Sequence, residues 1–381
     1  MKELKTTHNI TSDPSRFYLL DLSRSIAALC VVLQHYQLFY YLPDNSMPNS
    51  FLRSQQPFYE YIHFFYSFGS VAVQYFFVLS GFVFFLVYKD KVYHRAVTLR
   101  NFFILRLSRL YPLVILTLLF AAFLQLFYNE LTNDYFIYKY NDIKHFILNI
   151  FLVNQWGFQN GDSFNGPAWS ISIEVLLYAS FFLFARLGMR NLLYVILVII
   201  LVVIFITENL ISQGFFCFYI GGITYYILLG IKKSLINYKP RRIIIVLSLI
   251  ILDILIFGRF LNPFFINHQE NLEFLFGKDI KFLLFAIKFP LLILNLAIIQ
   301  FIYPNIGSYT KLLGDLSYTI YLIHFPIQIT FALLNISFIT INYDNNITFL
   351  TYIFSVFFIS FLIFRFFELP FKNVIRSRMI R

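Results

Sequence analysis

Apolar runs of about twenty residues recur from one end of the chain to the other, and they restrict the possible folds most. A run of this length crosses the hydrocarbon core of a bilayer as an α-helix, because a helix satisfies its own backbone hydrogen bonds. The composition agrees, with 59% hydrophobic and 13% charged residues, where soluble domains carry about 25% charged residues. The sequence therefore predicts an all-α integral membrane protein.

Hydropathy over windows of about 19 residues predicts ten transmembrane helices in one bundle. We place them at 17–40, 69–88, 110–127, 168–185, 192–206, 214–231, 243–260, 282–302, 312–334 and 348–367. The outer connection that follows the third helix is long, and we expect its stretch 143–153 to lie along the membrane surface.

The distribution of Lys and Arg predicts the orientation of these helices, because cytoplasmic loops keep an excess of both residues. They gather in one alternating set of connections and are few in the other. The rich set comprises the N-terminal tail, 89–109, 186–191, 232–242, 303–311 and the C-terminal tail. Both termini are therefore expected in the cytoplasm, with 1–16 as a polar tail and 368–381 as a basic tail.

The net charge of +11 forms no single patch, so nucleic acid is not an expected partner. Cys30 and Cys217 lie in apolar runs and predict neither a disulfide framework nor a metal site. No linker divides the chain. We expect one domain over 1–381, in the bacterial inner membrane, with membrane lipid as a partner and self-association left open.

Ionisable side chains inside predicted helices are functional candidates, because an unpaired charge in hydrocarbon costs several kcal/mol. Arg24 and His35 share the first helix and, eleven positions apart, the same face, roughly 16 Å apart along the axis. Arg24 can instead be a snorkelling anchor at the inner interface, and His35 a histidine satisfied by a backbone carbonyl.

Three further candidates lie near helix entrances. Glu174 follows Pro167 near the outer start of the fourth helix, at a depth comparable to His35. It can alternatively be a protonated acid bonded to a neighbouring helix. Arg106 and Arg109 share a face and suit phosphate binding, but they serve equally well as positive-inside anchors.

Several segments, taken in order, resemble one known family. They are Asp21-Leu22-Ser23-Arg24 with His35, Phe76-Phe77-Val78-Leu79-Ser80-Gly81-Phe82, the Arg-x-x-Arg pair Arg106 and Arg109, Trp169-Ser170-Ile171-Ser172-Ile173-Glu174 with Tyr178, the stretch Leu316-Ser317-Tyr318-Thr319-Ile320-Tyr321-Leu322-Ile323-His324, and Glu368-Leu369-Pro370. Together they resemble the acyltransferase-3 family, the integral membrane O-acyltransferases that modify O-antigen and other glycans. One departure is Val175, where family members often carry a second Glu.

The resemblance implies an acyl-CoA-dependent O-acyltransferase that transfers an acyl group, by default acetyl, to a hydroxyl of an envelope or lipid-linked glycan. No permanently bound cofactor is implied, and acyl-CoA is the co-substrate. Catalysis is expected from His35 and Glu174, and donor binding from Arg24, Arg106 and Arg109. Supporting positions are Ser80, Trp169, Ser170, Ser172, Tyr178, Tyr318, His324 and Glu368.

We expect Glu174 to pair with His35 and fix its tautomer, while His35 takes the proton of the acceptor hydroxyl. An acyl-histidine intermediate is the competing route. For His324, which precedes Pro326 by two positions, a structural role satisfying a carbonyl freed by the proline is favoured over catalysis. For Glu368, an ion pair with Arg365 is expected.

The strongest rival hypothesis is a glycan or lipid transporter or flippase, since buried ionic groups also mark translocation paths. The sequence shows no repeat between halves and no paired interrupted helices of the transporter kind. A second rival hypothesis is a structural partner in glycan export without catalysis. It does not explain the polar residues inside the predicted helices. A zinc enzyme is disfavoured because no His-Glu spacing typical of such sites occurs.

Overall fold

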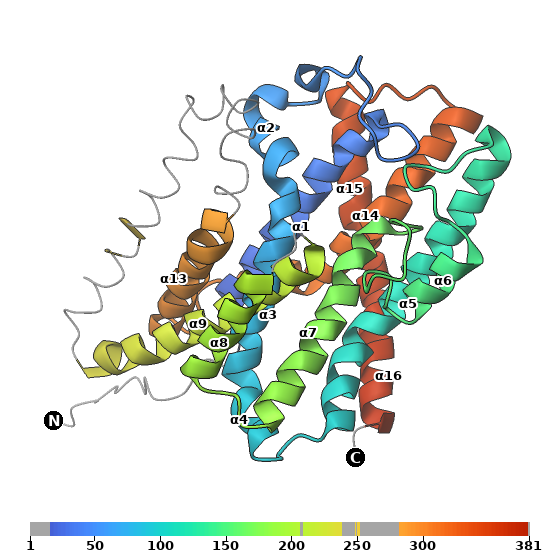
Figure 1. Ribbon diagram of the computed structural model, residues 1–381. Helices are drawn as coiled ribbons and strands as arrows, with labels where there is room; N and C mark the ends of the chain where they lie inside the picture. Colours follow the sequence, from blue (N-terminus) through green and yellow to red (C-terminus); the bar gives the residue numbers. More distant parts are fainter. Residues whose placement is uncertain (1–15, 206–208, 238–247, 249, 252–281, 380–381) are drawn as a thin grey trace.

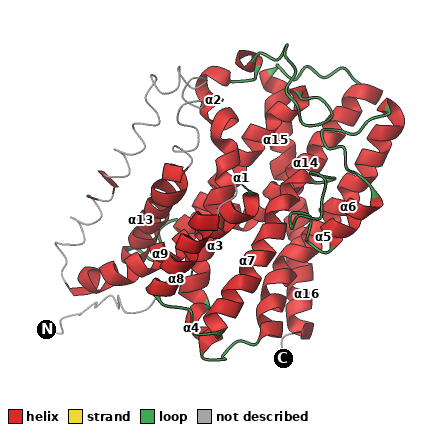
Figure 2. Cartoon of the chain, in the orientation of Figure 1, coloured by secondary structure: helices red, strands yellow, loops and turns green. Residues whose placement is uncertain are grey.

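The computed structural model describes residues 16–205, 209–237, 248, 250–251 and 282–379. Within these ranges the regular elements are helices, apart from one isolated β-bridge between Leu42 and Ser46. Most of the long helices stand side by side in one bundle, and coil links their ends (Figures 1 and 2). The predicted all-α class is confirmed.

The helices longer than nine residues have the following bounds: α1 Tyr18–His35, α2 Tyr59–Phe68, α3 Ala72–Val87, α5 Leu99–Thr132, α7 Trp169–Arg186, α8 Leu192–Phe205, α9 Leu210–Asn237, α13 Phe289–Ile302, α14 Lys311–Ser337, α15 Asn346–Ile363 and α16 Leu369–Met379. Shorter helices include α4 Lys89–Tyr93 and α6 Ile143–Ile150. Two π-helical turns, Leu284–Lys288 and Phe364–Glu368, precede α13 and α16.

Seven of the described helical segments are long and apolar enough to cross a membrane. They are Tyr59–Val87, Leu99–Thr132, Gly166–Arg186, Leu210–Lys232, Leu284–Ile302, Ser308–Ser337 and Asn346–Met379. Each contains most of one predicted span. The chain is thus a multi-pass membrane protein, while the count of ten and the cytoplasmic termini stay predictions.

The other three predicted spans differ from these seven. The span 17–40 corresponds to α1 followed by a 3-10 turn at Tyr36–Tyr40. α1 is more polar than the seven segments because it contains Asp21, Arg24 and His35. The span 192–206 corresponds to an apolar stretch that is shorter, Leu192–Val203. The span 243–260 lies almost wholly outside the described residues.

Two helices extend beyond the predicted spans. α5 begins at Leu99, eleven residues before the predicted start, because Thr98 caps it by accepting a hydrogen bond from the Asn101 N–H. Arg106 and Arg109 therefore lie about two to three turns inside a helix and not at its entrance. At the other end of the chain, the predicted basic tail is largely helical, because α16 continues to Met379.

α14 occupies the centre of the bundle and contacts α1, α5 and α15. Gly314 allows a close approach to α1, since a Cβ atom there would lie 2.5 Å from the Cβ of Asp21. One turn after His324, Gln328 donates a hydrogen bond of 2.7 Å to the backbone carbonyl of His35. These contacts fix the register of α1 against α14, and so set which side chains of the two helices meet.

The long outer connection folds back into the bundle. Figure 1 shows α7 starting well below the upper ends of α5 and α14. Asn165, just before this start, donates 3.0 Å to the carbonyl of Leu322. Pro326 lacks the N–H that would bond that carbonyl in an uninterrupted helix. The freed carbonyl of Leu322 therefore accepts its hydrogen bond from Asn165. His324, which we expected to bond a carbonyl freed by the proline, faces the carbonyl of Ile320 instead.

Candidate active site

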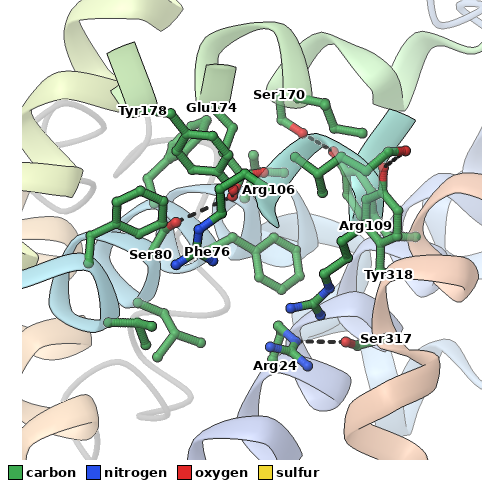
Figure 3. A pocket seen from close by; sticks show the side chains of 18 residues that line it. Arg24, Phe76, Ser80, Arg106, Arg109, Ser170, Glu174, Tyr178, Ser317 and Tyr318 are labelled. Atoms are coloured by element: carbon green, nitrogen blue, oxygen red, sulfur yellow. Dashed lines mark hydrogen bonds between the residues drawn. The ribbon is translucent and has the colours of Figure 1, made fainter. Parts of the chain in front are cut away.

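A cavity of about 140 Å³, lined by apolar and charged side chains, lies among α1, α3, α5, α7 and α14. Its lining includes three arginines, Arg24, Arg106 and Arg109, and one carboxylate, Glu174. Figure 3 shows the guanidinium groups of Arg24 and Arg109 in the same part of the cavity. The surplus of positive charge over one carboxylate favours an anionic ligand.

Arg24 is held in place by polar groups of two helices. Its Nε donates 2.8 Å to the hydroxyl of Ser317, and its Nη2 donates 2.6 Å to the Gly314 carbonyl. Asp21, one turn earlier on α1, lies 3.1 Å from the same guanidinium. Arg24 therefore has a fixed position at the cavity wall, which a freely snorkelling side chain would not have.

Arg106 is held by aromatic rings. Its guanidinium carbon lies 4.1 Å from the ring centre of Phe84 and 4.5 Å from that of Tyr88. Stacking on rings leaves the edge of a guanidinium free to donate hydrogen bonds, and the Nε of Arg106 is buried without a hydrogen-bond partner among the described residues. Both features suit an arginine that binds an anionic oxygen.

Glu174 lies beside Arg106 in the cavity, and its carboxylate accepts hydrogen bonds from α3 and α7. The Ser80 hydroxyl donates to it over 3.3 Å, and the Tyr178 hydroxyl donates to the same oxygen. Neither ring nitrogen of His35 bonds Glu174, so the expected pair is not formed. The physical reason is depth: α7 starts inside the bundle, which places Glu174 with the arginines.

His35 instead meets His324. Its Nδ1 lies 2.7 Å from the Nε2 of His324, with the ring centres 5.0 Å apart. His324 is completely buried, and its Nδ1 lies 3.2 Å from the carbonyl oxygen of Ile320. His35 and His324 thus form one hydrogen-bonded pair across α1 and α14.

Tyr321 connects the cavity to this histidine pair. It lines the cavity, its hydroxyl lies 2.9 Å from that of Ser170, and its ring centre lies 6.2 Å from that of His324. The arginines and the histidine pair therefore belong to one continuous region of the bundle.

The remaining supporting positions surround this region. Tyr318 lines the cavity and donates to the Leu110 carbonyl, and Ser172 accepts a hydrogen bond from the backbone N–H of Gln155. Trp169 packs edge-on against Phe77. Glu368 is buried and accepts 2.6 Å from the Thr319 hydroxyl. Its expected ion pair with Arg365 is absent from the described residues.

Sequence reasoning missed two members of the site, Ser317 and Tyr321, as separate candidates. Both stand in the stretch that resembles the family, and both lie one or two turns from His324 on the helix. A search for polar residues three, four and seven positions before a buried histidine would have found them.

Comparisons with known proteins bear on the class of this site. Residues 17–365 match the family Acyl_transf_3, described as an acyltransferase domain. A stretch of 111 residues, 29% of this chain, is 35% identical to "Protein 2 in picA locus" of Rhizobium radiobacter. The chain spans about half of that protein's length, 47%. No solved structure matches the chain.

The match over most of its length shows that the chain belongs to the acyltransferase-3 family. With the seven apolar helices, it defines a multi-pass membrane protein that carries an acyltransferase domain.

Proposed function

We propose that this membrane acyltransferase transfers an acyl group, by default acetyl, from cytoplasmic acyl-CoA to a hydroxyl of an envelope or lipid-linked glycan. The observation that carries the proposal is the convergence of Arg24, Arg106 and Arg109 on one cavity that adjoins a buried histidine.

The donor is inferred from the chemistry of the cavity. Guanidinium groups bind phosphate oxygens through charge-assisted hydrogen bonds, and acyl-CoA carries phosphates at one end and the reactive thioester at the other. A cavity of about 140 Å³ is smaller than the roughly 300 Å³ or more of typical ligand sites, so it suits a part of the donor. We assign the phosphates to the arginines and the thioester to the end near Tyr321.

His35 is the proposed general base, and its imidazole removes the proton from the acceptor hydroxyl as that oxygen attacks the thioester carbonyl. Such a base typically contributes about 10² to 10⁴ in rate. Glu174 remains a proposed member of the site. Its carboxylate accepts hydrogen bonds from Tyr178 and Ser80 and so holds both side chains near Arg106.

Topology supports the direction of transfer. The Lys and Arg distribution assigns the side of α5 that carries Arg100, Arg106 and Arg109 to the cytoplasm. The donor would enter there and the acceptor glycan from the opposite side. The proposed membrane is the bacterial inner membrane, where acyl-CoA is available on the cytoplasmic face.

Acyl-CoA binding tests the donor site. The double variant Arg106→Ala with Arg109→Ala should bind acetyl-CoA about 10² to 10⁴ times more weakly, because hydrogen bonds to charged groups contribute about 1.5–3 kcal/mol each. Calorimetry on purified protein measures this change. Arg190→Ala is the matched control, since Arg190 pairs with Asp90 outside the cavity. Unaltered binding in the double variant would remove the phosphate role.

A further inference from the structure

The contact between His35 and His324 has only one protonation pattern that satisfies all of its hydrogen bonds. The Ile320 carbonyl can only accept, so the His324 Nδ1 that faces it at 3.2 Å carries a proton. In a neutral imidazole the other nitrogen then bears a lone pair. The Nε2 of His324 must therefore accept the hydrogen bond of 2.7 Å, and the Nδ1 of His35 must donate it.

Charge supports the neutral pattern. A cation buried away from water is costly, and two adjacent imidazolium rings would also repel each other. Among the described residues, neither ring of the pair bonds a carboxylate that would offset a charge. In the resting enzyme both rings are neutral, and one proton occupies the shared contact.

We propose that His324 is a positioning residue that holds His35 in the tautomer with a proton on Nδ1 and a free lone pair on Nε2. This inference rests on the proposed role of His35 as general base. His324 thus takes the place that the sequence assigned to Glu174. A backbone carbonyl, His324 and His35 form a chain in which each group sets the tautomer of the next.

Further contacts hold the two rings in place. Gln328 donates to the backbone carbonyl of His35, and the Tyr352 hydroxyl donates 3.2 Å to the backbone carbonyl of His324. α14 therefore contacts the end of α1 at His324 and Gln328, one turn apart, and α15 holds His324 from the other side. His35 keeps part of its surface exposed, whereas His324 is fully buried. We therefore assign the contact with the substrate to His35.

The proton balance of transfer follows. The Nε2 of His35 takes the proton of the acceptor hydroxyl while that oxygen forms a bond to the thioester carbonyl carbon. The carbon–sulfur bond then breaks, and the departing thiolate takes the proton from Nε2. During this step His35 is an imidazolium, and its Nδ1–H bond to the lone pair of His324 stabilises it. His324 keeps its own proton throughout.

Two amide substitutions of different length test this assignment. In His324→Gln the amide reaches the position of Nε2, so its oxygen can accept from His35. In His324→Asn it reaches only the position of Nδ1 and cannot. We expect His324→Gln to keep kcat within about tenfold of wild type and His324→Asn and His324→Leu to lose about 10² to 10⁴, with the KM for acetyl-CoA unchanged. Equal loss in the Gln and Asn variants, or a Leu variant within threefold of wild type, overturns the assignment.

A spectroscopic measurement adds a readout that does not depend on activity. In protein with 15N-labelled histidine, the His35 signals, identified by their loss in His35→Ala, should show a protonated Nδ1 and an unprotonated Nε2. The same pattern should persist in His324→Gln and be lost in His324→Leu. A protonated Nε2 in the wild type contradicts the inference. If His35→Ala itself keeps full transfer activity, the proposed function fails first, and the two failures are thereby distinguished.

Discussion

At the scale of single residues, the site has two parts, a cavity lined by arginines and a pair of histidines next to it. Arginines from α1 and α5 gather where an anion would bind, and the histidine pair lies beyond Tyr321. Glu174 is on the arginine side, hydrogen-bonded to Tyr178 and Ser80. In our proposal Glu174 therefore shapes the donor site, since its hydrogen bonds are to Tyr178 and Ser80 and not to His35.

Glu174→Gln tests this placement. Loss of the charged acceptor should weaken the hold on Tyr178, whose ring stacks on Phe84 at a centre distance of 4.6 Å, and so loosen the ring under Arg106. A bond to a charged acceptor contributes about 1.5–3 kcal/mol, so donor binding should weaken by about tenfold. Ser80→Ala, which removes only the 3.3 Å bond, should stay within about threefold. Equilibrium binding of acetyl-CoA measures both, and tighter binding by the Gln variant would contradict the role.

The sequence could show which residues carry chemistry but not which of them meet. Arg24 and His35 could be placed on one helix face from spacing alone. The pairing of His35 with His324 could not, because it depends on how α1 docks on α14, across almost the whole chain. Glu174 was placed too near the outer surface because the depth at which α7 starts is set by the loop before it.

At the scale of elements, small residues let the helices approach closely. Gly81 of α3 and Gly221 of α9 face the opposite backbone, and a Cβ atom would lie 1.8 Å from the Phe218 oxygen or 2.0 Å from the Val78 oxygen. Helices in lipid associate mainly through such packing. α3 carries Ser80 beside Gly81, so this contact also sets one wall of the cavity.

Gly81→Ala should therefore destabilise the fold. Overpacking of a tight contact costs about 1–3 kcal/mol, and here the added methyl group would meet backbone atoms that cannot move aside alone. Gly230→Ala in α9 is the matched control, because its Cβ would meet nothing within 4 Å. Thermal unfolding in detergent should show a lower midpoint for Gly81→Ala than for Gly230→Ala. Equal midpoints would argue against the close packing of α3 on α9.

The bond between Asn165 and Leu322 gives a second prediction at this scale. Asn165→Ala leaves the Leu322 carbonyl without its donor, and such a loss costs about 1–3 kcal/mol. Pro326→Ala restores a backbone N–H that can bond the same carbonyl. In that background Asn165→Ala should cost less, and unfolding measurements on the four variants of the cycle quantify the difference. Purely additive effects would show that the proline is not the reason for the contact.

At the scale of the whole molecule, the apolar runs predicted the helical class and most of the helices, because the bilayer fixes their length. The predicted helix boundaries were less accurate, since charged residues near helix ends can remain helical. Arg106 and Arg109 were placed in a loop on their charge, yet α5 extends to Leu99. The arrangement of the helices, and with it the cavity, depends on packing that hydropathy does not encode.

The central claim is that His35 of α1 acts as the general base in the transfer of an acyl group to a glycan of the cell envelope. It is tested most directly by mass spectrometry of envelope polysaccharide from a deletion strain that expresses wild-type protein or His35→Ala at equal membrane levels. The wild type should restore a mass increment of one acyl group, and the variant should not, because loss of a general base lowers the rate about 10² to 10⁴. The same increment in both strains, or in neither, would contradict the account.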